Sequence, residues 1–180
     1  MSFVKDILDT CGYGYIWLLQ GDFNTKWLSI NVKQSLFDQF QQNWRSNINN
    51  SPKGLSYRLY KDKFEFEKYL DILPDKDRIL FCKFRTVNHR LPIETGRWFG
   101  LDRQIRYCNL CQSQELGDEF HYLLGCRFLE DSRKQFLDKY FWNRVNIIKF
   151  SKLLQTTHRN KLKNICKFIK VINLRAGLPG

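Results

Sequence analysis

The chain has 180 residues, of which 43% are hydrophobic and 16% aromatic, and it carries a net charge of +12. This length and apolar content exclude an intrinsically disordered chain and allow a buried core. No run approaches the about 18 consecutive apolar residues of a membrane span, and Asp6 and Asp9 interrupt any signal-peptide order, so we expect an intracellular protein of nucleus or cytoplasm with no membrane partner.

Residues 1–75 are expected to form a helical N-terminal region. The stretch SFVKDILDTCG predicts a short helix that ends at Gly12. The stretch LSYRLYKDKFEFEKYLDILP alternates like a strand in its first half and is helix-like in its second half, up to Pro74. Between them, NVKQSLFDQFQQNWRSNINN predicts an amphipathic helix, with apolar residues at every fourth position: Val32, Leu36, Phe40 and Trp44.

Residues 76–150 are expected to hold a zinc-binding module with flanking basic helices. Upstream of the cysteines, PDKDRILFCKFRTVNHRLP predicts one helix between Pro74 and Pro92, whereas IETGRWFGLDRQIRY is loop-like. Downstream, RFLEDSRKQFLDKYF predicts a further helix. The apolar stripe of the upstream helix is formed by Leu80, Phe84, Val87 and Leu91.

Residues 151–180 are expected to contain a basic amphipathic helix, HRNKLKNICKFIKVINLR. Its apolar stripe is that of a helix docked on a core, with a basic face left in solvent. The whole chain is thus predicted to be mainly α, as one or more small helical domains organised around a zinc knuckle. The stripe consists of Leu162, Ile165, Ile169 and Ile172, and the basic face of Lys163, Lys167 and Lys170.

The segment RYCNLCQSQELGDEFHYLLGC contains three cysteines and a histidine in the spacing Cys108-x2-Cys111-x9-His121-x4-Cys126. A C-x2-C pair places two thiolates on one tight turn, and a following His and Cys complete a tetrahedral zinc site. Four protein ligands leave no open position for a reacting water. We therefore predict a structural Zn²⁺ and no catalytic one.

The spacing of His121 and Cys126 conflicts with a regular α-helix, because five residues place them roughly 140° apart around the axis. Gly125 offers a point where the helix can end or loosen. We expect Asp118 to cap the start of this helix. A carboxylate should also accept the free N–H of the histidine ring; the candidates are Glu115, Asp118 and Glu119.

Positive charge surrounds the cysteine cluster but is absent from it. Lys and Arg outnumber Asp and Glu by 8 to 3 in residues 76–106 and by 13 to 3 in residues 127–180, against 0 to 3 in residues 107–126. Cations interleaved with Phe84, His89 and Trp98 are typical of nucleic-acid contact, although a solvated basic surface and a core phenylalanine explain the same residues. The contact candidates are Arg85, Arg90, Arg97 and Arg133.

The stretches CKFRTVNHRLPIETGRW and CNLCQSQELGDEFHYLLGC, followed by Arg133, resemble the zinc-binding region C-terminal to the polymerase domain of non-LTR retrotransposon reverse transcriptases. The resemblance covers about residues 82–133. It implies a zinc knuckle that helps to hold RNA or target DNA, in a chain without the polymerase's own aromatic-x-Asp-Asp motif. The matching positions are Arg85, Leu91, Cys108, Cys111, Glu119, His121, Leu123, Leu124, Cys126 and Arg133.

The sequence therefore favours a non-catalytic, zinc-binding module that binds RNA or DNA and takes no small-molecule substrate. The alternative is a zinc-stabilised interaction module that docks on a polymerase domain or a host protein. A hydrolytic or deaminating zinc enzyme is excluded by the four ligands and by the missing H-x-E signature.

Overall fold

The computed structural model describes residues 22–51 and 53–177, with side chains from residue 29 onward, and these residues are mostly helical. Their only β-type pairing is an isolated bridge between Tyr107 and Leu116, so the predicted mainly α class is confirmed. The helix predicted in SFVKDILDTCG lies outside the described residues. No described helix is long and apolar enough to cross a membrane.

The chain divides into two compact units, Met1–Arg45 and Ser46–Gly180. The described part of the first unit belongs to helix α2, Asp22–Asn50, which contains the predicted amphipathic stretch. Three apolar residues of its predicted stripe are 40–67% exposed: Val32, Leu36 and Phe40.

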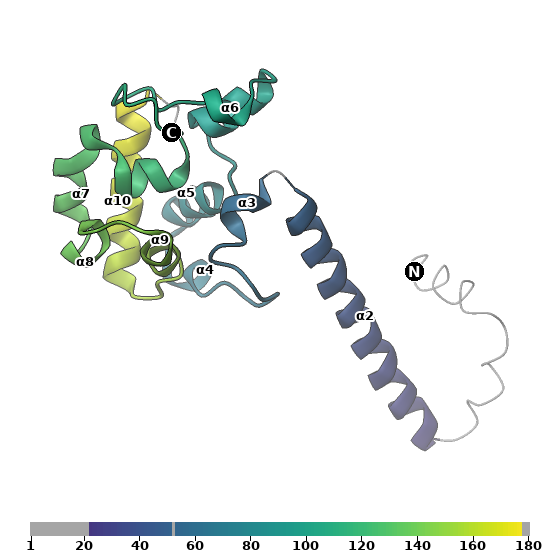
Figure 1. The fold of residues 1–180 in the computed structure, drawn as a ribbon. Helices are drawn as coiled ribbons and strands as arrows, with labels where there is room; N and C mark the ends of the chain where they lie inside the picture. Colours follow the sequence, from purple (N-terminus) through teal and green to yellow (C-terminus); the bar gives the residue numbers. More distant parts are fainter. Residues whose placement is uncertain (1–21, 52, 178–180) are drawn as a thin grey trace. The chain divides into compact units, whose positions relative to one another are not determined.

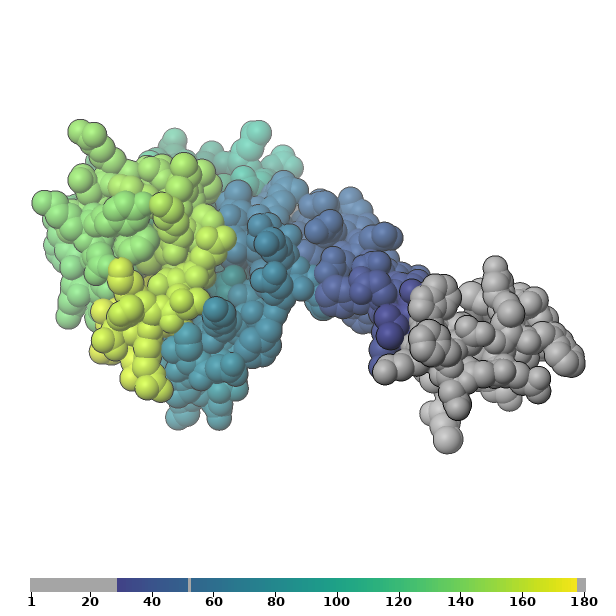
Figure 2. Space-filling model, turned by 90° about the horizontal axis from the view of Figure 1, so that it is seen from below, coloured from purple at the N-terminus to yellow at the C-terminus, as the bar shows by residue number. Residues whose placement is uncertain are grey.

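The second unit is an assembly of short helices around one core (Figure 1). The last helix, α10, contacts α5 and α7, and Figure 2 shows yellow α10 side by side with the blue-green α5 region. The predicted α10 stripe is fully buried, as expected. The α-helices are α3 Gly54–Tyr57, α4 Tyr69–Ile72, α5 Asp75–Arg85, α6 Pro92–Trp98, α7 Glu130–Phe136, α8 Lys139–Trp142, α9 Ile147–Leu154 and α10 Arg159–Arg175; the other helical turns are η2 Arg103–Ile105, η3 His121–Gly125 and η4 Arg127–Leu129.

Helix α5 is shorter than the sequence predicts, because it ends at Arg85. Val87 takes a left-handed conformation with φ of 54°, which no helix can continue through. The N–H groups of Val87 and Asn88 then bond back to the carbonyls of Phe84 and Lys83, at 3.3 and 2.8 Å, which is the usual pattern of a helix end. Val87 is nevertheless buried, as its place in the apolar stripe suggested.

Helix α6 replaces the loop that was expected after Pro92, so that prediction was wrong. Pro92 lies in the first turn, where its fixed φ suits a helix start and its missing N–H costs nothing. Gly96 did not break the helix; it lets Arg106 pack closely, since a Cβ there would lie 2.6 Å from Cγ of Arg106. The close packing of the Arg106 side chain, and not a break in the helix, therefore explains the glycine at position 96.

Two further differences concern the helices between the cysteines and α10. The single helix expected in RFLEDSRKQFLDKYF is split into α7 and α8, because Leu137 is extended with φ −113° and ψ 143°. The indole of Trp142 donates to the carbonyl of Leu137 at 3.1 Å and stabilises this break. Helix α9 was not predicted, and the strand-like stretch after Gly54 forms α3 and irregular chain.

One hydrophobic core spans all three regions that the sequence suggested. It contains Tyr60 from the first region, Phe81 and Phe150 from the second, and Ile169 from the third. The structure places its single boundary after Arg45, whereas the sequence suggested boundaries at 75 and 150. The cysteine cluster and the terminal helix therefore belong to the same folded unit.

Candidate metal centre

The structure brings together all four predicted ligands: Cys108, Cys111, His121 and Cys126. Their ligand atoms all lie within 4.8 Å of one another. The sulfurs of Cys108 and Cys126 are 3.9 Å apart, and Nε2 of His121 is 3.3 Å from the sulfur of Cys111. This cluster could hold a metal ion.

The first pair of ligands lies on a loop closed by backbone hydrogen bonds. The N–H of Cys108 donates to the carbonyl of Glu115 at 2.9 Å, and the N–H of Gly117 donates to the carbonyl of Arg106 at 2.8 Å. The N–H of Leu110 points at the sulfur of Cys108, at 3.4 Å. Such N–H donors stabilise a thiolate, the form of cysteine that binds metals.

The second pair of ligands is placed by a π-helical turn, His121–Gly125. The N–H of Cys126 donates to the carbonyl of His121 at 2.7 Å, a bond across five residues in place of the four of an α-helix. This wider turn brings the two residues close to one full revolution apart, so both side chains face the cluster. The expected loosening before Cys126 is therefore confirmed, and its form is a π-turn.

Gly125 lies inside this turn and close to the histidine ring. A Cβ at Gly125 would lie 3.3 Å from Nδ1 of His121, which is tighter than an ordinary contact. The chain leaves the helical conformation at Cys126, with φ −61° and ψ 120°. The glycine therefore gives the imidazole the room that the turn requires.

Two carboxylates hold the histidine in place. Oδ1 of Asp118 accepts the backbone N–H of His121 at 2.9 Å, as expected for a residue at the helix start. Oε2 of Glu115 lies 2.7 Å from Nδ1 of His121. Of the three carboxylates considered, Glu115 is thus the partner of the ring, and Nε2 is left to face the thiols.

Glu119, the third carboxylate, joins a separate buried network. Its side chain is 1% exposed and accepts hydrogen bonds from Oγ of Ser56, at 2.8 Å, and from Nε2 of His89, at 2.7 Å. Glu119 thereby ties α3 and the segment before α6 to the helix that carries His121. The sequence gave no signal for this pairing, because Ser56, His89 and Glu119 lie far apart in the chain.

Hydrogen bonds among the thiols and the imidazole shift the pKa values of the cluster. The hydrogen bond with Cys126 lowers the pKa of Cys108 to about 3, against the effect of burial and with help from His121. Burial lowers the pKa of His121, but hydrogen bonds to Cys108 and Cys111 outweigh it and raise the pKa to about 9. A metal cation binds the same lone pairs, so metal binding would release these protons.

Arg85 and Arg133 lie in the core, which contradicts their proposed role in nucleic-acid contact. Arg85 is 2% exposed, pairs with Glu67 at 2.7 Å and has its guanidinium 4.9 Å from the ring centre of Tyr69. Arg133 is 4% exposed and donates to the carbonyls of Leu123, at 2.7 Å, and Cys126, at 2.8 Å. Both guanidinium groups thus bond to other parts of the protein and lie out of reach of a phosphate in solvent.

Arg90 and Arg97 are accessible. Arg90 is exposed and makes no side-chain hydrogen bond or ion pair with any residue in the described ranges. The side chain of Arg97 is 37% exposed and donates to Glu94 at 2.6 Å. These two residues remain contact candidates.

Comparison with known proteins adds no information about the candidate metal centre. No family model, curated protein or solved structure matches the chain. The cluster with one imidazole and three sulfurs is therefore the chief observation from which a function can be argued.

Proposed function

We propose that the cluster binds Zn²⁺ as a structural ion. Zinc bonds of about 2.3 Å to sulfur and about 2.0–2.1 Å to nitrogen give tetrahedron edges of roughly 3.5–3.8 Å. The observed separations of 3.9 Å between the sulfurs of Cys108 and Cys126, and 3.3 Å between Cys111 and His121, are close to these edges. Three thiolates and one imidazole are a donor set that zinc prefers, and they complete its coordination.

We further propose that the chain is a non-catalytic module that binds RNA or DNA. A zinc site with three thiolates has a charge of −1, so phosphates must be bound by the neighbouring basic residues. The single observation that carries the proposal is this metal cluster beside a basic segment whose Arg90 and Arg97 reach the solvent. The resemblance of residues 82–133 to the retrotransposon zinc-binding region supports the same function.

Salt dependence tests the proposal. The zinc-loaded protein is titrated into fluorescein-labelled RNA and DNA, and binding is followed by anisotropy. We expect the affinity to fall at least about tenfold between about 50 and about 200 mM salt, because bound phosphates release counterions. An affinity that does not depend on salt concentration, or no binding to either nucleic acid, would contradict the proposal.

A protein-interaction module is the second candidate, and helix α2 favours it. Ile30, Val32 and Leu36 of this helix are 56%, 48% and 40% exposed. Apolar residues on one surface helix are typical of docking on a polymerase domain or a host protein. Replacing the three residues with Ser should leave oligonucleotide affinity unchanged and abolish such docking, and a loss of oligonucleotide affinity would exclude this candidate.

A further inference from the structure

A pocket of about 310 Å³ lies beside helix α6, within the second unit. Apolar side chains and cations line it together, a composition that suits a ligand with both a flat apolar part and a negative charge. The residues that matter are the cations Lys53, Arg97, Arg103 and Arg106 and the apolar Leu55 and Ile93.

The positive charge of this pocket exceeds what its carboxylates neutralise. Glu94 is 1% exposed and is shared by two cations, Lys53 at 2.9 Å and Arg97 at 2.6 Å. Glu119, the other carboxylate of the lining, accepts hydrogen bonds from Ser56 and His89. The lining thus holds four cations against two carboxylates, which leaves a net positive charge.

Two of the arginines account for this excess. Arg106 donates to the carbonyls of Ile93, at 2.9 Å, and Leu101, at 2.6 Å, and its charge has no carboxylate partner among the residues that the structure describes. Arg103 is 48% exposed and lies 3.9 Å from Asp118, the limit of an ion pair. The pocket therefore favours an anion.

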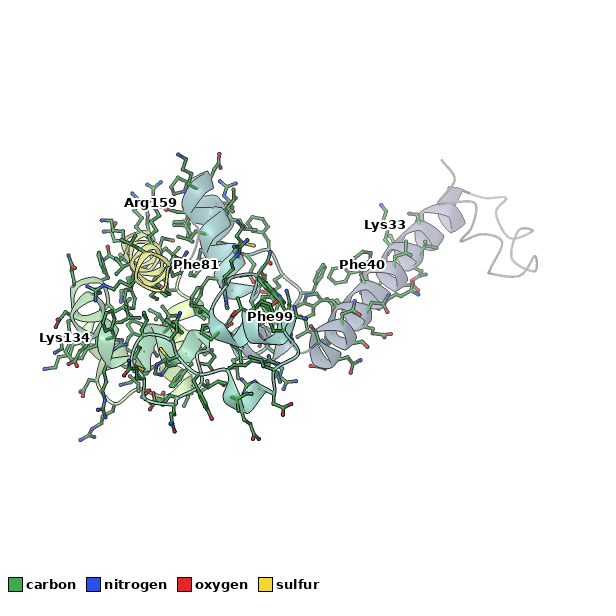
Figure 3. All side chains as sticks on the ribbon, turned by 90° about the horizontal axis from the view of Figure 1, so that it is seen from above. Lys33, Phe40, Phe81, Phe99, Lys134 and Arg159 are labelled. Carbon is green, nitrogen blue, oxygen red and sulfur yellow. The ribbon has the colours of Figure 1, made fainter. Side chains whose placement is uncertain are left out.

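The C-terminal end of α6 carries two exposed aromatic residues. Trp98 is 51% exposed and Phe99 80% exposed, although large aromatic side chains are usually buried. Figure 3 looks down on the side of the unit where α6 lies and labels Phe99. Further exposed apolar residues in the next turns are Leu101, Ile105 and Tyr107.

Trp98 is exposed but held in place. Its indole Nε1 donates to Oε1 of Glu94 at 2.9 Å, the same oxygen that accepts from Arg97. A buried carboxylate thus fixes one cation and one aromatic ring next to each other. A ring that is ordered before binding loses little conformational entropy when a flat ligand stacks on it.

We propose that this surface binds unpaired nucleotides, with phosphates at the cation-lined pocket and bases stacked on Trp98 and Phe99. The inference rests on the proposed nucleic-acid binding and specifies its substrate class as single-stranded RNA or DNA. Cations that follow the backbone, together with aromatic rings for the bases, are the usual means of single-strand binding. A duplex keeps its bases inside and offers nothing to the rings.

Single strands and duplexes distinguish this surface from a merely basic one. The zinc-loaded protein is titrated into labelled RNA and DNA strands of about 12 nucleotides, within the usual site size, and into the matching duplexes. Stacking of each base is worth roughly 5- to 150-fold in affinity. We expect the double variant Trp98→Leu/Phe99→Leu, which keeps the apolar side chains but removes the rings, to lose about tenfold or more for single strands and less than about twofold for duplexes.

Matched variants isolate the cause. Phe66→Leu changes an aromatic residue that is 65% exposed outside this surface and should have no effect on binding. Arg103→Gln should weaken binding and its salt dependence, whereas Lys163→Gln on α10 should change the affinity much less. Phe99→Leu alone, at a residue 80% exposed, guards against misfolding of the double variant.

Each remaining outcome overturns the inference in a distinct way. Strong, salt-dependent binding that is unchanged in both aromatic variants would overturn the stacking surface and leave the proposed function intact. No binding of any oligonucleotide would overturn both. A change in oligomeric state with unchanged oligonucleotide affinity would show that the rings contact a second protein chain.

Discussion

At the scale of single residues, the buried cations are the most informative side chains. Arg133 follows the cysteine cluster in sequence as a basic residue would follow a nucleic-acid site, yet it donates to the carbonyls of Leu123 and Cys126. These carbonyls lie in and just after the π-helical turn, where intrahelical donors are lacking. Arg133 therefore stabilises the turn between His121 and Cys126.

Removing this guanidinium should destabilise the protein. We expect Arg133→Met, which keeps most of the side-chain volume, to lower the free energy of unfolding by about 2–4 kcal/mol, because two buried carbonyls lose charged donors. Urea denaturation of the zinc-loaded protein measures the change. The control is Arg90→Met at an exposed residue, which should stay within about 0.5 kcal/mol; equal effects of the two variants would refute this role of Arg133.

At the scale of elements, the π-helical turn resolves the conflict between the ligand spacing and helical geometry. An α-helix from Asp118 onward would have pointed Cys126 away from His121, and the extra residue in the turn redirects it. The small residue before Cys126 makes this possible without moving the histidine ring. The π-helical turn and Gly125 therefore act together to place Cys126 beside His121.

A methyl group at position 125 tests whether the π-helical turn needs a glycine there. Because it would lie 3.3 Å from Nδ1 of His121, the ring must shift and its contact with Glu115 must weaken. We expect Gly125→Ala to reduce zinc affinity by about tenfold, the usual effect of disturbing the partner of a metal-binding histidine. Competition with a coloured chelator gives the affinity, and Gln104→Ala, at an exposed residue, is the control; unchanged affinity would mean that the ring tolerates the methyl group.

The sequence predicts the helical class and the grouping of the four Cys and His side chains well, and it predicts individual helix ends poorly. The Cys and His spacing and the α10 stripe are local patterns, so they could be recognised without the fold. The end of α5 depends on Val87 in a left-handed conformation, where glycine is the usual signal. The burial of Arg85 depends on Glu67 and Tyr69, which are distant in sequence, so its periodicity and charge gave no warning.

At the scale of the whole unit, the cysteine cluster and the core are continuous. Cys108 and Cys126 are themselves members of the buried core, together with Leu123, Leu129 and Phe168. Structural zinc contributes on the order of 10–16 kcal/mol in small modules, compared with about 5–15 kcal/mol of total stability for a domain. Metal loss should therefore affect more than the cysteine loop.

Loss of one ligand should disorder at least residues 100–130. We expect Cys111→Ser to abolish stoichiometric zinc and to raise hydrogen exchange in this region, with a smaller increase across α10, because both share the core. Mass spectrometry reports both quantities. Cys82→Ser, at a half-buried thiol of α5 outside the cluster, is the control; a Cys111→Ser protein with full zinc content and unchanged protection would show that the ion is not held by these four residues.

The continuity of this core also limits how the protein can be shortened. A fragment that stops after Phe150 would lose the whole of α10 and uncover the faces of α5 and α7 on which it lies. Those apolar faces would then be exposed to solvent. The shortened protein should therefore aggregate or bind chaperones, even with its cysteines intact. The cysteine loop is thus not an independent module, and a shortened protein has to keep everything from Ser46 to the last turn of α10.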